Sequence, residues 1–124
     1  MMRTAGPCSN APARSLRCRP AMQVTAHDVQ QAHAAIKSHI QHTPTIEAPR
    51  LGEMLGLRLW LKLETMQFTG SFKDRGSCLK LQRLAQSANP PAGVAAASAG
   101  NHAQGVAYHA RRLGLKATIV MPLT

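Results

Sequence analysis

Lys73 is the side chain with the clearest potential for covalent chemistry. It lies in the run QFTGSFKDRG at residues 67–76, where a glycine-marked turn leads into a helical pattern. An amine at such a loop-to-helix junction can face a crevice and form a Schiff base with a carbonyl group. The alternative is an ordinary ion pair of Lys73 with Asp74, or with a nearby carboxylate, at the start of the helix. Position and spacing alone leave both interpretations open.

The other four of the five lysines stand in ordinary settings. Lys37, Lys80 and Lys116 are expected on helix surfaces or at a strand entrance, and Lys62 occupies a polar position of an alternating strand pattern. Such positions are typical of solvated side chains. Lys73 is therefore the candidate for a reactive amine.

A second segment with chemical potential is ASAGNHAQG at residues 97–105, which connects a short predicted strand to a helix. A Gly-Asn turn at this place presents backbone N–H groups at a helix N-terminus, which suits an anion. The alternative is an ordinary turn, with Asn101 in the left-handed conformation and Ser98 as a local cap. No Gly-Lys-Ser/Thr follows Gly105, which argues against a nucleotide-binding loop.

Together the two segments resemble the lysine segment and the asparagine loop of fold-type II pyridoxal-phosphate enzymes, and most closely those of the threonine dehydratases (threonine ammonia-lyases). The resemblance covers roughly residues 25–124. It implies an α/β fold with parallel-sheet βαβ units, and pyridoxal 5'-phosphate as cofactor. Lys73 would hold the cofactor through its amine, Phe72 would pack against the pyridine ring, and Asn101 would contact the ring hydroxyl.

By the same resemblance, the asparagine loop receives the carboxylate of a small amino-acid substrate. The substrate-binding residues are then Ser98, Ala99, Gly100, Asn101 and His102. Serine racemases of this fold carry a serine, as a second proton-transfer group, at the position of Ala99. Because the methyl group of Ala99 cannot ionise, the resemblance favours β-elimination over racemisation.

The resemblance thus implies elimination of water from L-threonine or L-serine, which yields a 2-oxo acid and ammonia. Lys73 would remove the α-proton, and the cofactor would act as the electron sink. Racemisation, hydroxyaspartate dehydration and cysteine synthesis remain alternatives on the same fold. The family's phosphate-binding loop lies downstream of residue 124, so we expect an N-terminal fragment, inactive by itself, of a homo-oligomeric parent.

The chain is strongly basic, with 15 Lys and Arg residues against 5 Asp and Glu residues and a net charge of +10. A non-catalytic module that binds nucleic acid or an acidic partner is therefore a rival hypothesis. One Trp, one Tyr and two Phe residues are too few for a base-stacking platform. The apolar runs are also shorter than a membrane span requires. We expect neither nucleic acid nor a membrane as partner.

Three cysteines give no indication of a metal site. Cys8, Cys18 and Cys78 lack the spacing of zinc ligands, and His27 and His33 lie too far along the chain to complete such a set. Reduced thiols in a cytoplasmic protein are the simpler interpretation.

The chain divides near Met22. Residues 1–21 lack periodicity and indicate a disordered basic tail, an organellar transit peptide or an extension upstream of the true start. Residues 22–124 form the truncated enzyme domain, with helices predicted at 25–41, 49–55, 72–86 and 102–113 and strands at 57–64, 94–97 and 116–121. This alternation predicts three parallel strands joined by helices. Apolar faces left uncovered would make the isolated chain self-associate.

Overall fold

The structure, a computed structural model, describes residues 24–123. The predicted tail at residues 1–21, with Cys8 and Cys18, lies outside these residues. The helices are α1 (Ala26–Ile36), α2 (Pro49–Leu55), the short 3-10 helix η1 (Glu64–Met66), α3 (Lys73–Ala85) and α4 (Asn101–Arg112). The strands are β1 (Thr45–Glu47), β2 (Trp60–Lys62), β3 (Gly93–Ala97) and β4 (Lys116–Val120).

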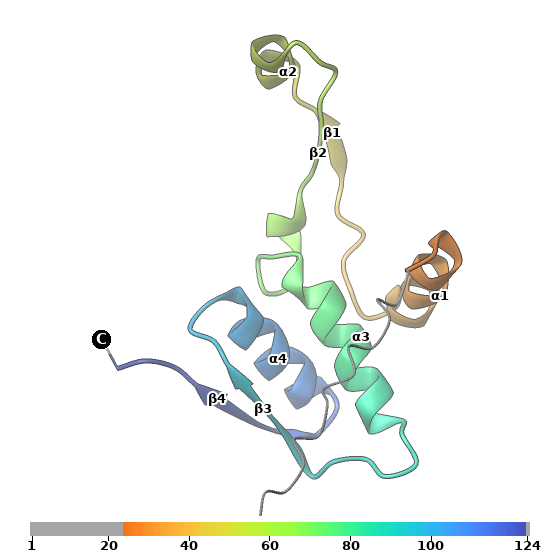
Figure 1. The fold of residues 1–124 in the computed structure, drawn as a ribbon, viewed down its shortest axis with the longest axis vertical. Coiled ribbons are helices and arrows are strands. Elements are labelled where there is room, and N and C mark those ends of the chain that lie inside the picture. The colour runs from red at the N-terminus through yellow and green to blue at the C-terminus, as the bar shows by residue number, and fades with distance from the viewer. Residues whose placement is uncertain (1–23, 124) are drawn as a thin grey trace, which may run out of the picture.

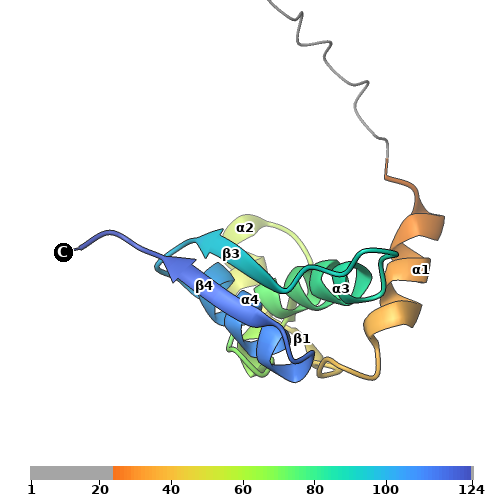
Figure 2. The same cartoon turned by 90° about the horizontal axis from the view of Figure 1, so that it is seen from below.

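The body of the molecule is built around α4, which packs between α3 and the sheet of β3 and β4 (Figures 1 and 2). Its core consists of Leu81 from α3 and of Val106 and Ala110 from α4, all of them buried. Apolar side chains of the strands, among them Val94 and Ile119, pack against this cluster. Burial of these side chains holds the two helices in place against the sheet.

β3 and β4 form the parallel pair that the sequence predicts for this part of the chain. The register runs from Gly93 opposite Lys116 to Ala97 opposite Val120, and α4 connects the two strands. Gly114, with a φ of +69°, makes the sharp turn from α4 into β4. The asparagine loop therefore follows the carboxyl end of β3, the edge at which open α/β sheets bind ligands.

The prediction of three parallel strands is wrong, because the strand predicted at 57–64 does not join this sheet. Only Trp60–Lys62 form a strand, β2, which pairs antiparallel with β1. These two strands and α2 form an arm that projects from the body (Figure 1). An alternating pattern is typical of a strand with one buried face, but all three residues of β2 are exposed. β1 escaped prediction because three residues after Pro44 are too few to show an alternating pattern.

The predicted helices agree with the structure except at the end of the first one. α1 begins with an acidic capping box, in which the N–H of Thr25 donates to Asp28 Oδ2 (2.8 Å) and the N–H of Asp28 donates to Thr25 Oγ1 (3.2 Å). This helix ends at Ile36, several residues before its predicted end, in a turn where the N–H of His39 donates to the carbonyl oxygen of Ile36 (2.8 Å). Gly56 ends α2 in the left-handed conformation, as predicted.

Much of the apolar surface of the arm and of β4 is uncovered. Met54 is 82% exposed, Trp60 51%, Val120 59% and Met121 54%. Within residues 24–123 there is no helix with both the length and the apolar character needed to cross a bilayer. Apolar surface of this kind in a chain marks a place where other protein surface can pack.

We expect residues 22–124, taken alone, to self-associate through this surface. Light scattering should give a molar mass above that of the monomer, and replacing both Met54 and Trp60 with lysine should lower it. A wild-type chain that stays monomeric at high concentration would contradict this expectation.

Candidate active site

Lys73 is the first residue of α3 and directly follows a turn built on Gly70. Gly70 has a φ of +69°, which favours glycine, and its N–H donates to the carbonyl oxygen of Gln67 (2.9 Å). The N–H of Lys73 then donates to Ser71 Oγ (3.4 Å). The predicted loop-to-helix junction is therefore confirmed at this position.

The amine of Lys73 is exposed and lies beside an aromatic ring. Its Nζ is 5.0 Å from the centroid of the Phe72 ring, and Phe72 is itself 61% exposed. No salt bridge of Lys73 is found within residues 24–123. The ion pair with Asp74, the simpler interpretation of the sequence, is wrong, because Asp74 is buried and contacts His109 instead. The amine is thus available to a ligand.

Asn101 opens α4 in a right-handed conformation. No non-glycine residue within 24–123 has a positive φ, so the alternative of a left-handed Asn101 is wrong. The prediction of Ser98 as a local cap is right, since Ser98 Oγ accepts a hydrogen bond from the N–H of Gly100 (3.2 Å). Ser98 is half-buried, whereas the rest of the predicted loop is exposed: Ala99, Gly100, Asn101 and His102.

One cavity joins the lysine segment to the asparagine loop. It has a volume of about 380 Å³, within the range of small-molecule sites, and is lined by Gly70, Ser71, Phe72 and Asn101 together with residues 61–65. Lys73 does not itself line the cavity, but its Nζ lies beside the ring of Phe72, which does. Of the predicted site residues, only Phe72 and Asn101 line this cavity; the others do not, namely Lys73, Ser98, Ala99, Gly100 and His102.

A half-buried salt bridge ties the base of the arm to α3. Arg75 Nε and Nη2 donate to the two carboxylate oxygens of Glu64 (2.8 and 2.7 Å), and Thr43 Oγ1 donates to Glu64 Oε1 (2.6 Å). The Arg75 guanidinium holds the pKa of Glu64 at about 2, below its ordinary value of 4.5, while partial burial acts in the opposite direction. Because Glu64 also lines the cavity, this cluster fixes the cavity wall to the helix of Lys73.

We expect Glu64 to make stability depend on pH between about 4.5 and about 2. Since the pKa of Glu64 is lower in the folded chain, its stabilisation is complete above the unfolded value of 4.5 and is lost as the pH falls toward 2. The contribution is at most about 3 kcal/mol. Urea unfolding at neutral and at acidic pH should differ less for Glu64→Gln than for the wild type.

Glu47→Gln is the matched control for this experiment. It removes an exposed pair, Arg58 with Glu47, whose side chains are 73% and 41% exposed. Exposed pairs contribute little to stability, so the pH dependence should stay that of the wild type. Equal pH dependence in Glu64→Gln and Glu47→Gln would contradict the assignment to Glu64.

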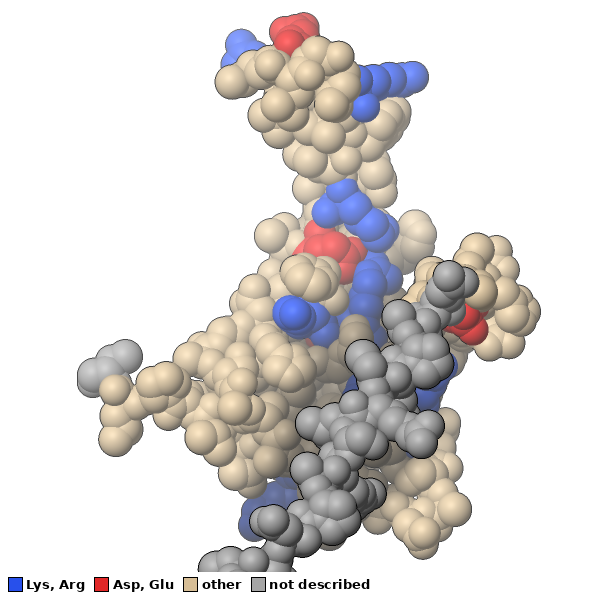
Figure 3. Space-filling view, viewed as in Figure 1, with Lys and Arg blue, Asp and Glu red and all other residues tan. Residues whose placement is uncertain are grey.

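Two hollows border α1, away from the asparagine loop. One, of about 320 Å³, lies between α1 and α3 and is mostly apolar. The other, of about 340 Å³, has basic side chains in its wall, namely His33, Lys37, His42, Lys62 and Arg75. Figure 3 shows lysine and arginine side chains gathered around an acidic one where the arm meets the body. Neither hollow includes residues 97–105, and neither does a third of about 430 Å³ beside α2. The cavity beside Lys73 is therefore the candidate active site.

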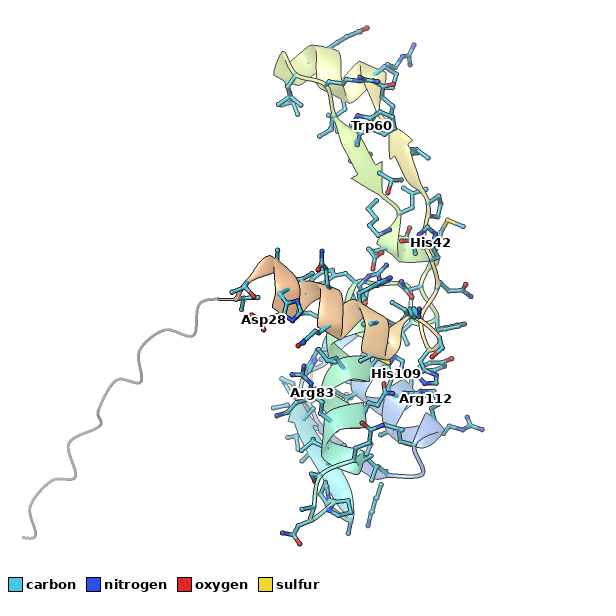
Figure 4. The ribbon with its side chains drawn as sticks, turned by 90° about the vertical axis from the view of Figure 1, so that its right-hand side faces the viewer. Asp28, His42, Trp60, Arg83, His109 and Arg112 are labelled. Carbon is cyan, nitrogen blue, oxygen red and sulfur yellow. The ribbon has the colours of Figure 1, made fainter. Side chains whose placement is uncertain are left out.

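A buried polar chain that no local sequence pattern predicts links α3 to α4. Oδ1 of Asp74 lies 3.0 Å from Nε2 of His109, and neither side chain is exposed. Oδ2 of Asp74 accepts a hydrogen bond from the N–H of Thr69 (2.9 Å). Arg112, next to His109 on α4 (Figure 4), donates through Nε to His109 Nδ1 (3.4 Å). The acid directly after Lys73 could have indicated a buried polar contact, but no residue near it in the sequence identifies His109 as its partner.

A βαβ unit, an exposed lysine at a helix start and an asparagine loop at the carboxyl end of β3 are features of an α/β protein that can hold a carbonyl ligand. The sequence model of the pyridoxal-phosphate dependent enzyme family matches residues 36–124. The chain belongs to this family and has its fold-type II α/β architecture.

Three known proteins show how far the similarity extends. The catabolic L-threonine dehydratase of Staphylococcus aureus is 49% identical over 102 residues, which are 82% of this chain and 29% of that protein. The crystal structure of a T.th. threonine deaminase is 44% identical, with a TM-score of 0.66, over 80% of this chain and 31% of that one. A pyridoxal 5'-phosphate-dependent aspartate racemase is 36% identical, with a TM-score of 0.72, over 86% of this chain and 33% of that one. The chain thus spans about a third or less of the length of these relatives.

Proposed function

We propose that the complete protein containing this chain is a pyridoxal-phosphate-dependent ammonia-lyase. It eliminates water from L-threonine or L-serine and releases a 2-oxo acid and ammonia. The observation that carries this proposal is the exposed amine of Lys73 beside the ring of Phe72, which lines one cavity together with Asn101. Similarity to the threonine dehydratase of Staphylococcus aureus supports the substrate class.

The side chains at the cavity fit an aldehyde cofactor with an aromatic ring. Lys62 lines the cavity but is already engaged, since its Nζ donates to the carbonyl oxygen of Thr43 (3.0 Å), whereas Lys73 lies beside the cavity residue Phe72. Lys73 would therefore hold the cofactor through Nζ, and the adjacent Phe72 would pack against the pyridine ring. When bound, the cofactor supplies an electron sink for charge that develops at the substrate α-carbon.

In the proposed reaction this chain binds the substrate and moves one proton. Nζ of Lys73 removes the proton from the α-carbon. The N-terminus of α4 binds the substrate carboxylate, because its backbone N–H groups and the helix dipole favour an anion. Asn101 adds its side chain to this site and contacts the ring hydroxyl of the cofactor. The loop around the carboxylate consists of Ser98, Ala99, Gly100 and His102.

Racemisation is the second candidate, since the chain is also similar to an aspartate racemase. Inversion at the α-carbon requires a proton donor on the face opposite Lys73. Ala99, in the middle of the asparagine loop, has only a methyl group and cannot supply that proton. The residues of the loop therefore favour elimination.

Assays of the complete protein with pyridoxal phosphate separate these candidates. L-threonine, L-serine and 3-hydroxyaspartate should be tested side by side, with detection of the 2-oxo acid, of ammonia and of the D-enantiomer. Elimination predicts equal amounts of 2-oxo acid and ammonia from threonine or serine. Inversion without release of ammonia would favour the racemase, and inert threonine and serine would reject the substrate class. Salt-sensitive nucleic-acid binding that Lys73→Arg leaves unchanged would favour the basic, non-catalytic module.

Location and assembly belong to the same proposal. Cys78 is a buried free thiol, and burial raises its pKa, which suits a reducing compartment such as the cytoplasm. The exposed apolar side chains of β4 and of the arm support assembly with further protein surface, and a homo-oligomer is the form we propose.

A further inference from the structure

Asp74 and His109 form a fully buried polar contact between α3 and α4. Both side chains have 0% exposure, and Oδ1 of Asp74 lies 3.0 Å from Nε2 of His109. A buried carboxylate is strongly unfavourable unless hydrogen bonds replace the lost water. Here both oxygens have a partner, because Oδ2 accepts the N–H of Thr69 (2.9 Å). The carboxylate thus connects α4 to the loop that precedes Lys73.

The second ring nitrogen of His109 determines the direction of this contact. Nδ1 lies 3.4 Å from Nε of Arg112, and a guanidinium nitrogen can only donate. Nδ1 therefore accepts, so that Nε2 carries the proton and donates to Asp74. Burial lowers the pKa of His109, although the hydrogen bond to Asp74 acts in the opposite direction. A neutral ring with a fixed tautomer makes a directional link between the helices.

The backbones of α3 and α4 approach closely beside this pair. A Cβ atom added to Gly105 would lie 2.8 Å from Ser77 Oγ and 3.3 Å from the carbonyl oxygen of Lys73. Gly105 and His109 are four residues apart and hence on one face of α4. The close approach and the buried pair therefore belong to one interface, which lies directly behind Lys73.

We propose that Asp74 and His109 are positioning residues that hold the lysine segment and the asparagine loop in one fixed arrangement. This rests on the proposed function, in which Lys73 binds the cofactor. Asp74 fixes the backbone around Lys73 in two ways. It is the next residue in the chain, and its Oδ2 accepts the N–H of Thr69 in the preceding loop. His109 transmits the position of α4, whose first residue is Asn101. A long, exposed amine needs such a rigid base to reach both the carbonyl group and the α-carbon.

Hydrogen exchange of the complete protein, measured without cofactor, tests the structural part. In His109→Leu the carboxylate of Asp74 loses a donor, and we expect the amide of Thr69 to exchange about ten- to a hundredfold faster. His109→Gln keeps an N–H donor and should stay close to the wild type. Val106→Ala, in the core of the same helix, should lower Tm but leave exchange at Thr69 unchanged.

Steady-state kinetics of the same variants, loaded with pyridoxal phosphate, test the effect on the site. We expect kcat of His109→Leu to fall about tenfold or more with KM nearly unchanged. His109→Gln should restore kcat, and Val106→Ala should retain it below its Tm. If His109→Leu does not fold, Asp74→Asn gives the same test, because its amide oxygen cannot take up both N–H groups as well as a carboxylate does.

The positioning role would be overturned by a folded variant that lacks the donor at position 109 and still shows slow exchange at Thr69 and a normal kcat. Fast exchange with normal kcat would overturn the link to catalysis. Failure of the proposed function has a different signature: Lys73 of the wild-type protein would take up no pyridoxal phosphate, whatever the exchange at Thr69.

Discussion

Lys73→Ala is expected to abolish turnover by the complete protein, with a loss in kcat/KM by a factor of about 10⁴ or more. The substitution removes the group that holds the cofactor and, with it, the base that takes the α-proton. Lys73→Arg should be equally inactive, because a guanidinium keeps the charge but forms no Schiff base. Formation of the 2-oxo acid measures the loss, and the visible absorbance band of lysine-bound pyridoxal phosphate should vanish with it.

Lys80→Ala is the matched control, since it removes an exposed lysine from the same helix. It should leave both the absorbance band and the turnover rate at wild-type levels. A Lys73→Ala protein that keeps the band, or that turns over at the rate of Lys80→Ala, would remove Lys73 from the mechanism.

Gly105→Val is expected to destabilise the protein by about 3 kcal/mol. The first added carbon would lie 2.8 Å from Ser77 Oγ and 3.3 Å from the carbonyl oxygen of Lys73, so α4 must move away from α3. This movement separates the lysine segment from the asparagine loop, and activity should fall along with stability. Urea unfolding followed by circular dichroism measures the first effect, and assays at low temperature measure the second.

Gly76→Ala provides the control within α3. A Cβ atom at Gly76 has no neighbour within 4 Å, so alanine meets open space. Because alanine is the better helix former, the substitution should be neutral or stabilise by about 0.5–1 kcal/mol. Comparable destabilisation by Gly105→Val and Gly76→Ala would show that contact between the helices is not what Gly105 provides.

Local signals in the sequence predicted the elements that carry the candidate site. The glycine turn before Lys73, the break after β3 and the glycine stops at Gly56 and Gly114 all depend on the conformational preferences of single residues. For this reason the start of α3 and the βαβ unit around α4 could be predicted from the chain alone. The family resemblance then pointed to Phe72, Lys73 and Asn101; Phe72 and Asn101 line one cavity, and the amine of Lys73 lies beside Phe72.

Contacts between residues distant in sequence could not be predicted in this way. β1 and β2 pair across a connection that includes α2. β1 has too few residues for a clear alternation, and the alternation around β2 does not indicate which strand it pairs with. Glu64 finds its partner in Arg75, and Asp74 finds its partner in His109, only after the helices have packed. Tertiary packing decides which charged or polar groups meet. The sequence therefore contains these side chains but does not indicate which of them pair.

Reduction of the cofactor-loaded protein with borohydride, followed by peptide mapping, tests the central claim most directly. Borohydride reduces a Schiff base to a stable amine. The lysine that holds pyridoxal phosphate therefore stays modified, and its peptide carries the added mass of the cofactor. We predict that the mass is found on the peptide with Lys73 and that an excess of substrate present before reduction lowers the yield. Labelling of Lys62, the lysine that lines the cavity, or an unmodified Lys73 would contradict the claim.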